Sequence, residues 1–142
     1  SITLRSGEGQ GRLIGGNHSI VQRLLHTKWA PDFDGAILYL EDINDELSWL
    51  DRDFWYYREI GLLEKLSGLV LGSFSQKESG KPFGFSLEDI LLEHCRGYDF
   101  PIALYAPFGH QAALHPLPFG SQGKLQITDK ETKLDFESPV QV

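Results

Sequence analysis

The sequence contains no methionine and only one cysteine, Cys95, and each scarcity limits what the chain can be. Without an initiating methionine, Ser1 is not expected to be the start of translation, so we expect a processed chain or part of a longer protein. Whether a signal peptide precedes Ser1 stays open. One cysteine excludes an internal disulfide and fits a reducing compartment, so we expect a cytoplasmic protein. Cys95 falls on an apolar helical stripe, which predicts a buried, unreactive thiol.

Positive charge and long apolar runs are also scarce. The formal net charge is −7, which argues against a nucleic-acid partner, because neutralising phosphates requires an excess of Lys and Arg. No apolar run approaches the length of a membrane span, so no membrane partner is expected. The His, Asp and Glu residues show no spacing typical of a metal site, and neither metal nor cofactor is expected. The 142 residues suffice for one core, so we expect residues 1–142 to form a single domain.

The strongest pattern is a run of five apolar residues, 36–40, that follows Gly35 and leads into Glu41 and Asp42. Such a run predicts a strand buried on both faces, and we expect it to end at the two carboxylates. A carboxylate at the tip of a buried strand is costly unless it is paired or faces a cleft. In open α/β sheets, ligands usually bind at this edge of the sheet. A strand that simply exits into solvent is the alternative.

The rest of the chain alternates between predicted helices and strands, which indicates an α/β fold with a largely parallel sheet. We expect Gly15 and Gly16 to form a tight turn, followed by Asn17 as a helix N-cap or, alternatively, as a ligand contact. His18 and His26 are expected to be polar positions on or beside that helix. A loop is expected at 73–84. The predicted helices are 17–26, 47–60 and 86–95, with a short helical turn at 62–66, and the further predicted strands are 69–71, 101–105, 120–127 and 133–136.

Two chemically active side chains follow strands of this predicted sheet. Glu41 follows the central strand, and His110 follows the strand at 101–105. Because the carboxyl ends of parallel strands meet at one edge, both side chains are expected there. A carboxylate that orients an imidazole is two-thirds of a nucleophilic hydrolase triad. Spacing alone does not single out these two residues, since any acid and any histidine at strand ends would satisfy it.

Four motifs that occur in order make the prediction more specific. They are residues 11–17 (GRLIGGN), 37–42 (ILYLED), 68–72 (GLVLG), and 107–110 (PFGH) with 117–120 (LPFG). Together they resemble the C-terminal domain of the LD-carboxypeptidase family of serine peptidases, over nearly the whole chain. That family includes murein tetrapeptide carboxypeptidases and microcin C self-immunity hydrolases. The resemblance implies a swivelling β/β/α domain, in which a central, largely parallel sheet is flanked by helices.

The resemblance also implies a Ser-Glu-His triad in which Glu41 and His110 match the family's glutamate and histidine. Asn17 matches a position that helps to hold substrate in the immunity-type relatives. The family's nucleophilic serine lies in a separate N-terminal domain, so that missing domain is an expected partner and this fragment alone is expected to be inactive. The implied activity of the full-length protein is hydrolysis of an L,D-peptide bond at the C-terminus of a murein-type peptide, in peptidoglycan recycling.

Two departures from the family pattern keep alternatives open. His18 follows the Gly-Gly-Asn stretch where an apolar residue is more usual, and residues 73–84 lack the acid-rich pattern of immunity-type members. The second departure favours a murein-type substrate. The alternatives are a microcin C immunity-type hydrolase of peptidyl-nucleotide amides and a non-catalytic swivelling domain in which Glu41 and His110 are incidental. We also expect an exposed apolar face beside Glu41 and His110, and leave open a homodimer formed through it.

Overall fold

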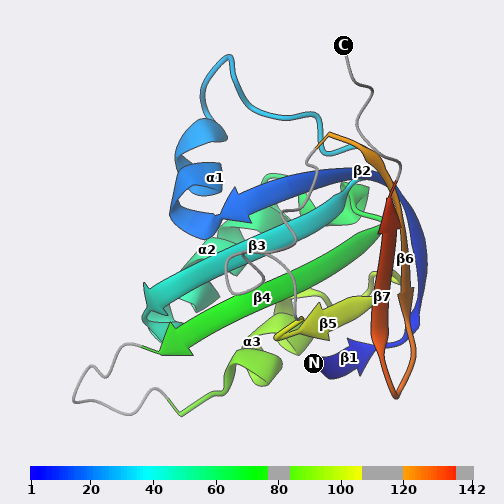
Figure 1. The fold of residues 1–142 in the computed structure, drawn as a ribbon. Coiled ribbons are helices and arrows are strands. Elements are labelled where there is room, and N and C mark those ends of the chain that lie inside the picture. Colours follow the sequence, from blue (N-terminus) through cyan, green and yellow to red (C-terminus); the bar gives the residue numbers. More distant parts are fainter. Residues whose placement is uncertain (77–83, 107–119, 137–142) are drawn as a thin grey trace.

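The computed structural model describes residues 1–76, 84–106 and 120–136 (Figure 1). Within these ranges the chain forms one seven-stranded sheet, three α-helices and a short 3₁₀ helix. The strands are β1 (Ile2–Arg5), β2 (Gly7–Asn17), β3 (Ile37–Asp45), β4 (Gly68–Gln76), β5 (Ile102–Leu104), β6 (Gln122–Ile127) and β7 (Thr132–Phe136). The helices are α1 (His18–Leu24), α2 (Leu47–Glu59), α3 (Leu87–His94) and the 3₁₀ helix η1 (Leu63–Lys65).

The middle of the sheet is parallel and its edges are antiparallel. The strand order is β1-β5-β4-β3-β2-β6-β7, and β2, β3, β4 and β5 pair in parallel. β1 pairs antiparallel with β5 at one edge, and the hairpin of β6 and β7 continues antiparallel from β2 at the other. The predicted α/β fold with a largely parallel central sheet is therefore confirmed.

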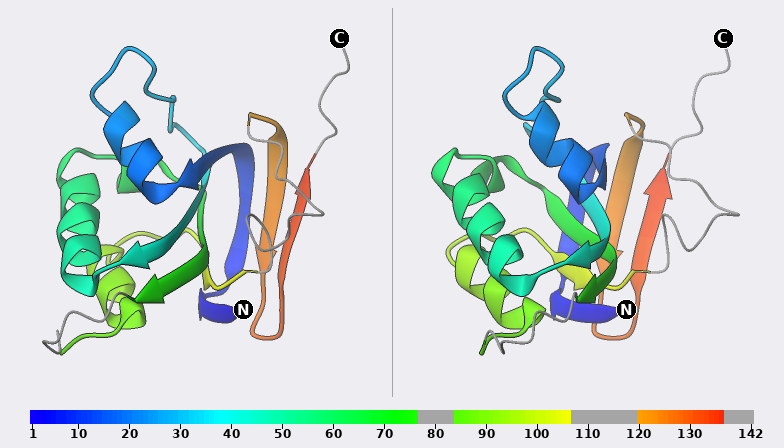
Figure 2. Two further views of the ribbon diagram at one scale, coloured as in Figure 1. Left: turned by 60° about the vertical axis from the view of Figure 1, so that its left-hand side comes forward. Right: turned by 90° about the vertical axis from the view of Figure 1, so that its left-hand side faces the viewer.

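The two faces of the sheet are covered in different ways (Figure 2). The three helices pack on one face, where Leu50 and Phe54 of α2 join Leu38 and Leu40 of β3 in the larger core. On the other face the sheet curls over itself. A second core there joins residues of β2–β5, and Ala106 just after β5, to the β6–β7 hairpin: Leu13, Ile37, Tyr39, Val70, Ala103, Ala106, Leu125, Ile127 and Leu134. The expectation of helices flanking the sheet is corrected here, because the helices cover one face and strands cover the other.

The sheet can curl because β2 pairs with two different strands along its length. Its first half pairs with β6 and its second half pairs with β3. Glycine is required where the strand crosses the start of the parallel layer: a Cβ on Gly11 would lie 1.8 Å from the carbonyl oxygen of Gly35. The predicted tight turn at Gly15 and Gly16 is wrong. Both glycines lie inside β2, and a Cβ on Gly15 would lie 1.7 Å from the carbonyl oxygen of Tyr39.

The strands run further than their apolar runs indicate. β3 does not end at Glu41 and Asp42 but continues to Asp45, and β4 occupies the first part of the expected loop, up to Gln76. The physical reason is that the two strands go on pairing with each other after their apolar residues have ended. The predicted helices and the β6–β7 pair are confirmed to within a few residues. No helix among the described residues is long and apolar enough to cross a membrane.

Candidate active site at the carboxyl edge of the sheet

Glu41 lies at a β-bulge between the two central strands. Leu40 pairs with Leu71 and Asp42 with Phe74, so β4 places two residues, Gly72 and Ser73, opposite the single residue Glu41 of β3. A bulge bends the strand locally, and bulges are common next to active sites because they re-aim side chains. Glu41 is half-buried there. It is thus not a strand tip that exits into solvent, and the irregular pairing supplies a reason for a carboxylate at this position.

Asn17 is the cross-strand neighbour of Glu41, on β2. Its side-chain oxygen accepts hydrogen bonds from the backbone N–H groups of Ser19, at 3.0 Å, and Ile20, at 3.3 Å. The prediction of Asn17 as the N-cap of the first helix is confirmed. The cap uses Oδ1 and not the amide NH₂ group, which is a double donor. The structure therefore brings together two of the three predicted site residues, Glu41 and Asn17.

His110, the third predicted residue, lies outside the described residues. The described chain leads toward the same edge, because β5 is parallel to β4 and ends at Leu104. The backbone N–H of Ala106 then donates to the carbonyl oxygen of Leu71, at 3.1 Å, immediately before the bulge. The expected contact between Glu41 and the His110 imidazole stays a prediction.

Tyr105 adds backbone strain at this edge. It is the one non-glycine residue with positive φ in the described part of the chain, at 55°. Bulky residues seldom adopt this conformation, and strained residues cluster at functional sites. Burial, and to a lesser extent the charge of Glu88, raises the pKa of the Tyr105 phenol. Sequence patterns gave no sign of it, because strain depends on how the chain leaves β5.

A buried polar cluster begins at the residue that follows Asn17. His18, expected as a polar position on or beside the helix, is the first residue of α1, and its side chain is buried, at 1% exposed. Its Nε2 lies 2.7 Å from the Tyr57 hydroxyl and 3.8 Å from Oδ2 of Asp53, whose Oδ1 accepts a hydrogen bond from Gln22 at 2.7 Å. The cluster joins α1, whose N-cap is Asn17, to α2. The signal available in the sequence was the departure itself, a histidine where an apolar residue is usual.

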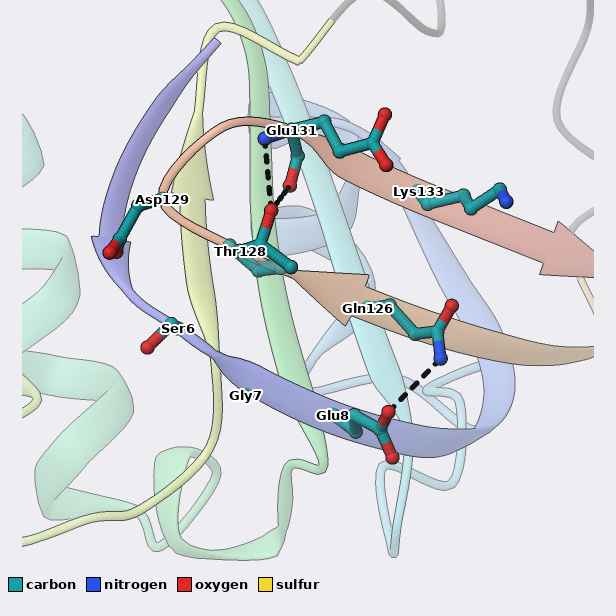
Figure 3. A pocket seen from close by; sticks show the side chains of 9 residues that line it. Ser6, Gly7, Glu8, Gln126, Thr128, Asp129, Glu131 and Lys133 are labelled. Carbon is teal, nitrogen blue, oxygen red and sulfur yellow. Dashed lines mark hydrogen bonds between the residues drawn. The ribbon is translucent and has the colours of Figure 1, made fainter.

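A surface pocket of about 460 Å³ lies elsewhere on the molecule (Figure 3). It is formed where β2 begins, beside the turn between β6 and β7, and is lined by Ser6, Gly7, Glu8, Gln126, Ile127, Thr128, Asp129, Glu131 and Lys133. β2 has 11 residues, so the pocket is roughly 30 Å from Asn17 along the strand. It is therefore separate from the edge that carries Glu41. Among the described residues, no group of three or more His, Cys, Asp or Glu could hold a metal ion.

Comparison with known proteins assigns a family to this arrangement. The family model for the LD-carboxypeptidase C-terminal domain matches residues 10–125. The murein tetrapeptide carboxypeptidase of Pseudomonas aeruginosa is 32% identical over 120 residues, which are 82% of this chain and 38% of that protein. The chain spans about 40% of the length of the curated relatives it matches.

Solved structures give the same fold. The muramoyltetrapeptide carboxypeptidase from Oxalobacter formigenes aligns with a TM-score of 0.83 and 30% identity, over 97% of this chain and 48% of that one. The wild-type microcin C7 self-immunity protein MccF aligns with a TM-score of 0.81 over 96% of this chain and 41% of that one. At 23% identity, the second likeness shows the fold alone.

Proposed function

The chain belongs to the LD-carboxypeptidase C-terminal domain family, and from this membership we propose that it supplies the acid–base half of a serine peptidase. Glu41 and His110 are the carboxylate and the imidazole of a Ser-Glu-His triad. The serine comes from a separate N-terminal domain outside the 142 residues, which themselves form a single C-terminal domain. On this proposal the 142 residues alone do not hydrolyse the substrate.

The observation that supports the proposal most strongly is the position of Glu41. It lies at a bulge in the middle of the parallel sheet, with Asn17 beside it on β2. β5 runs parallel to β3 and β4, and the segment that carries His110 begins after it. Catalytic and binding groups of α/β sheets gather at this edge, because the loops that follow the strands converge there.

The chemistry follows from the two side chains. The imidazole of His110 accepts the proton of the serine hydroxyl as its oxygen attacks the carbonyl carbon of the scissile amide. The imidazolium then donates that proton to the nitrogen of the departing D-residue. The Glu41 carboxylate accepts a hydrogen bond from the second imidazole nitrogen, which fixes the tautomer and stabilises the imidazolium. A water molecule then attacks the acyl carbon while His110 accepts its proton, and the imidazolium returns this proton to the serine oxygen as the acyl group leaves.

We propose a murein-type peptide with a C-terminal D-residue as the substrate, cleaved at its L,D bond during peptidoglycan recycling in the cytoplasm. Relatives named for murein and muramoyl tetrapeptides, at 32% and 30% identity, support this class. Asn17 is proposed to contact the substrate through its amide NH₂ group, since its oxygen caps α1.

The test is release of the terminal D-amino acid from a murein tetrapeptide by the full-length protein that contains this chain. We expect Glu41→Gln and His110→Ala each to lower kcat/KM by about 10⁴-fold or more, as losses of triad members do. Circular dichroism spectra and unfolding midpoints of both variants should match those of the wild type. The 142-residue chain by itself should release no D-amino acid above background.

Two variants away from the edge serve as controls. His26→Ala removes an exposed imidazole and Glu59→Gln neutralises an exposed carboxylate, and both should keep wild-type activity. Full activity in His110→Ala would contradict the proposed role of His110 as the general base. Activity in the 142-residue chain would show that the nucleophile lies within it.

A further inference from the structure

A buried phenol lies two residues before Glu41 on the same strand. Tyr39 is 1% exposed and belongs to the core under the β6–β7 hairpin. Side chains alternate between the faces of a strand, so residues two apart share a face. The extra residue of the bulge is in β4 and not in β3. Regular alternation along β3 therefore puts the Tyr39 and Glu41 side chains on one face of the sheet.

The far end of the phenol reaches the bulge itself. A Cβ added to Gly72 would lie 2.1 Å from the Tyr39 hydroxyl oxygen and 2.8 Å from Cζ, so the hydroxyl lies directly over the Gly72 backbone. Gly72 is one of the two β4 residues opposite Glu41. The phenol thus extends along the strand toward the carboxylate, and the missing side chain at Gly72 makes room for it.

The chemistry of the two groups is complementary. A phenol O–H is a donor, and an ionised carboxylate is an acceptor. Burial, and secondarily the charge of Glu41, raises the pKa of the Tyr39 phenol, so the phenol keeps its proton at physiological pH. A hydrogen bond from a neutral donor to a charged acceptor is stronger than one between neutral groups, and more so where water is excluded.

We propose that Tyr39 is a positioning residue that holds the Glu41 carboxylate in the orientation needed to bind the catalytic imidazole, and that Gly72 is required to admit its hydroxyl. The inference rests on the proposed function and deepens it. Tyr39 does not touch the substrate in this account. It acts on the reaction only through Glu41, in the way that outer hydrogen-bond partners orient ligands and bases in other sites.

The contact itself is tested in the 142-residue chain, without any activity assay. We expect the Tyr39 hydroxyl proton to give a slowly exchanging resonance in the proton NMR spectrum, assigned by its loss in Tyr39→Phe. In Glu41→Gln the resonance should shift upfield, because the acceptor loses its charge. A wild-type spectrum without this resonance, or one that Glu41→Gln leaves unchanged, would overturn the proposal.

The role is tested by kinetics in the full-length protein. Tyr39→Phe keeps the ring and should lower kcat/KM about tenfold while moving the acid limb of the pH–rate profile to higher pH. Gly72→Ala keeps the hydroxyl but displaces it, and should reproduce both effects. Gly68→Ala is the matched control on β4, since its Cβ would lie 2.6 Å from the end of the Leu125 side chain and 3.7 Å from Ile37, with no Tyr39 atom among these nearest contacts, and its pH profile should be that of the wild type.

An unchanged pH profile in Tyr39→Phe and Gly72→Ala would contradict the positioning role. If Tyr39→Phe does not fold, the pH profile of Gly72→Ala still decides the proposal. A wild-type protein without peptidase activity would refute the proposed function, and the hydroxyl resonance would then still show whether Tyr39 holds Glu41.

Discussion

Two consecutive tyrosines of α2 each pair with a histidine, one in the core and one at the surface. The Tyr57 hydroxyl lies 2.7 Å from Nε2 of buried His18, and the Tyr56 hydroxyl pairs with Nε2 of exposed His26. We expect Tyr57→Phe to lower the free energy of unfolding by about 1–2 kcal/mol, because it removes a partner from a buried polar group. Tyr56→Phe should cost less than about 0.5 kcal/mol, because water replaces the lost partner.

Urea unfolding of the two variants measures this difference. The substitutions remove the same atom from neighbouring residues, so any difference between them reports burial. Equal losses of stability would contradict a buried polar cluster at His18. A larger loss in Tyr56→Phe would indicate that His26, and not His18, is the buried histidine.

The shape of β2 depends on where its glycines meet other backbone. Gly11 of β2 and Gly123 of β6 face each other in one ladder. A Cβ on Gly11 would lie 1.8 Å from the Gly35 carbonyl oxygen, whereas one on Gly123 would meet its neighbours at an ordinary 3.5 Å. We expect Gly11→Ala to cost more than about 3 kcal/mol and Gly123→Ala less than about 1 kcal/mol. Circular dichroism during urea unfolding checks both values.

The pair separates steric contact from the general cost of changing a glycine in a strand. If Gly11→Ala were as stable as Gly123→Ala, β2 would not pass as close to the start of the parallel layer as the structure has it. The curl that brings β6 and β7 over the second face would then need another explanation.

For the whole molecule, the titration of buried groups predicts a loss of stability at alkaline pH. Burial raises the pKa of Cys95 from 9.0 to about 12, against the opposing charges of Arg5 and Arg58. Between pH 9.0 and about 12, the Cys95 thiol therefore keeps its proton in the native protein but loses it in the unfolded chain. This contribution to stability is intact below pH 9.0 and is lost progressively as the pH rises toward about 12.

We expect the free energy of unfolding of the wild type to fall between pH 8 and pH 10 by about 1 kcal/mol more than that of Cys95→Ala. The comparison between the two pH values removes any pH-independent cost of the substitution. Parallel pH dependence in the two proteins would contradict a buried thiol. The 0% exposure of Cys95 agrees with the expected inert thiol, so we also expect it to resist alkylation in the native state.

Sequence patterns predicted the elements better than their ends. Apolar runs marked the first part of β3 and β4 and the whole of β5, and helical spacing marked α1, α2 and α3, because burial selects those periods locally. The polar ends of β3 and β4 were missed, since pairing between the two strands is decided by the neighbour and not by the residues themselves. The turn predicted at Gly15 and Gly16 was wrong for the same reason. A glycine needed for close approach of another backbone has the same local sequence pattern as a glycine in a turn.

The sequence by itself determined the α/β class, the order of helices and strands, the family, and the choice of Glu41 and Asn17, because these depend on local periodicity and on motifs. Only the tertiary structure decided that strands cover one face, that His18 is buried against Tyr57, and that a bulge places Gly72 opposite Glu41 with the Tyr39 hydroxyl over it. Each of these depends on contacts between segments distant in the chain. Such contacts arise when the sheet curls and packs, and no residue pattern within one segment encodes them.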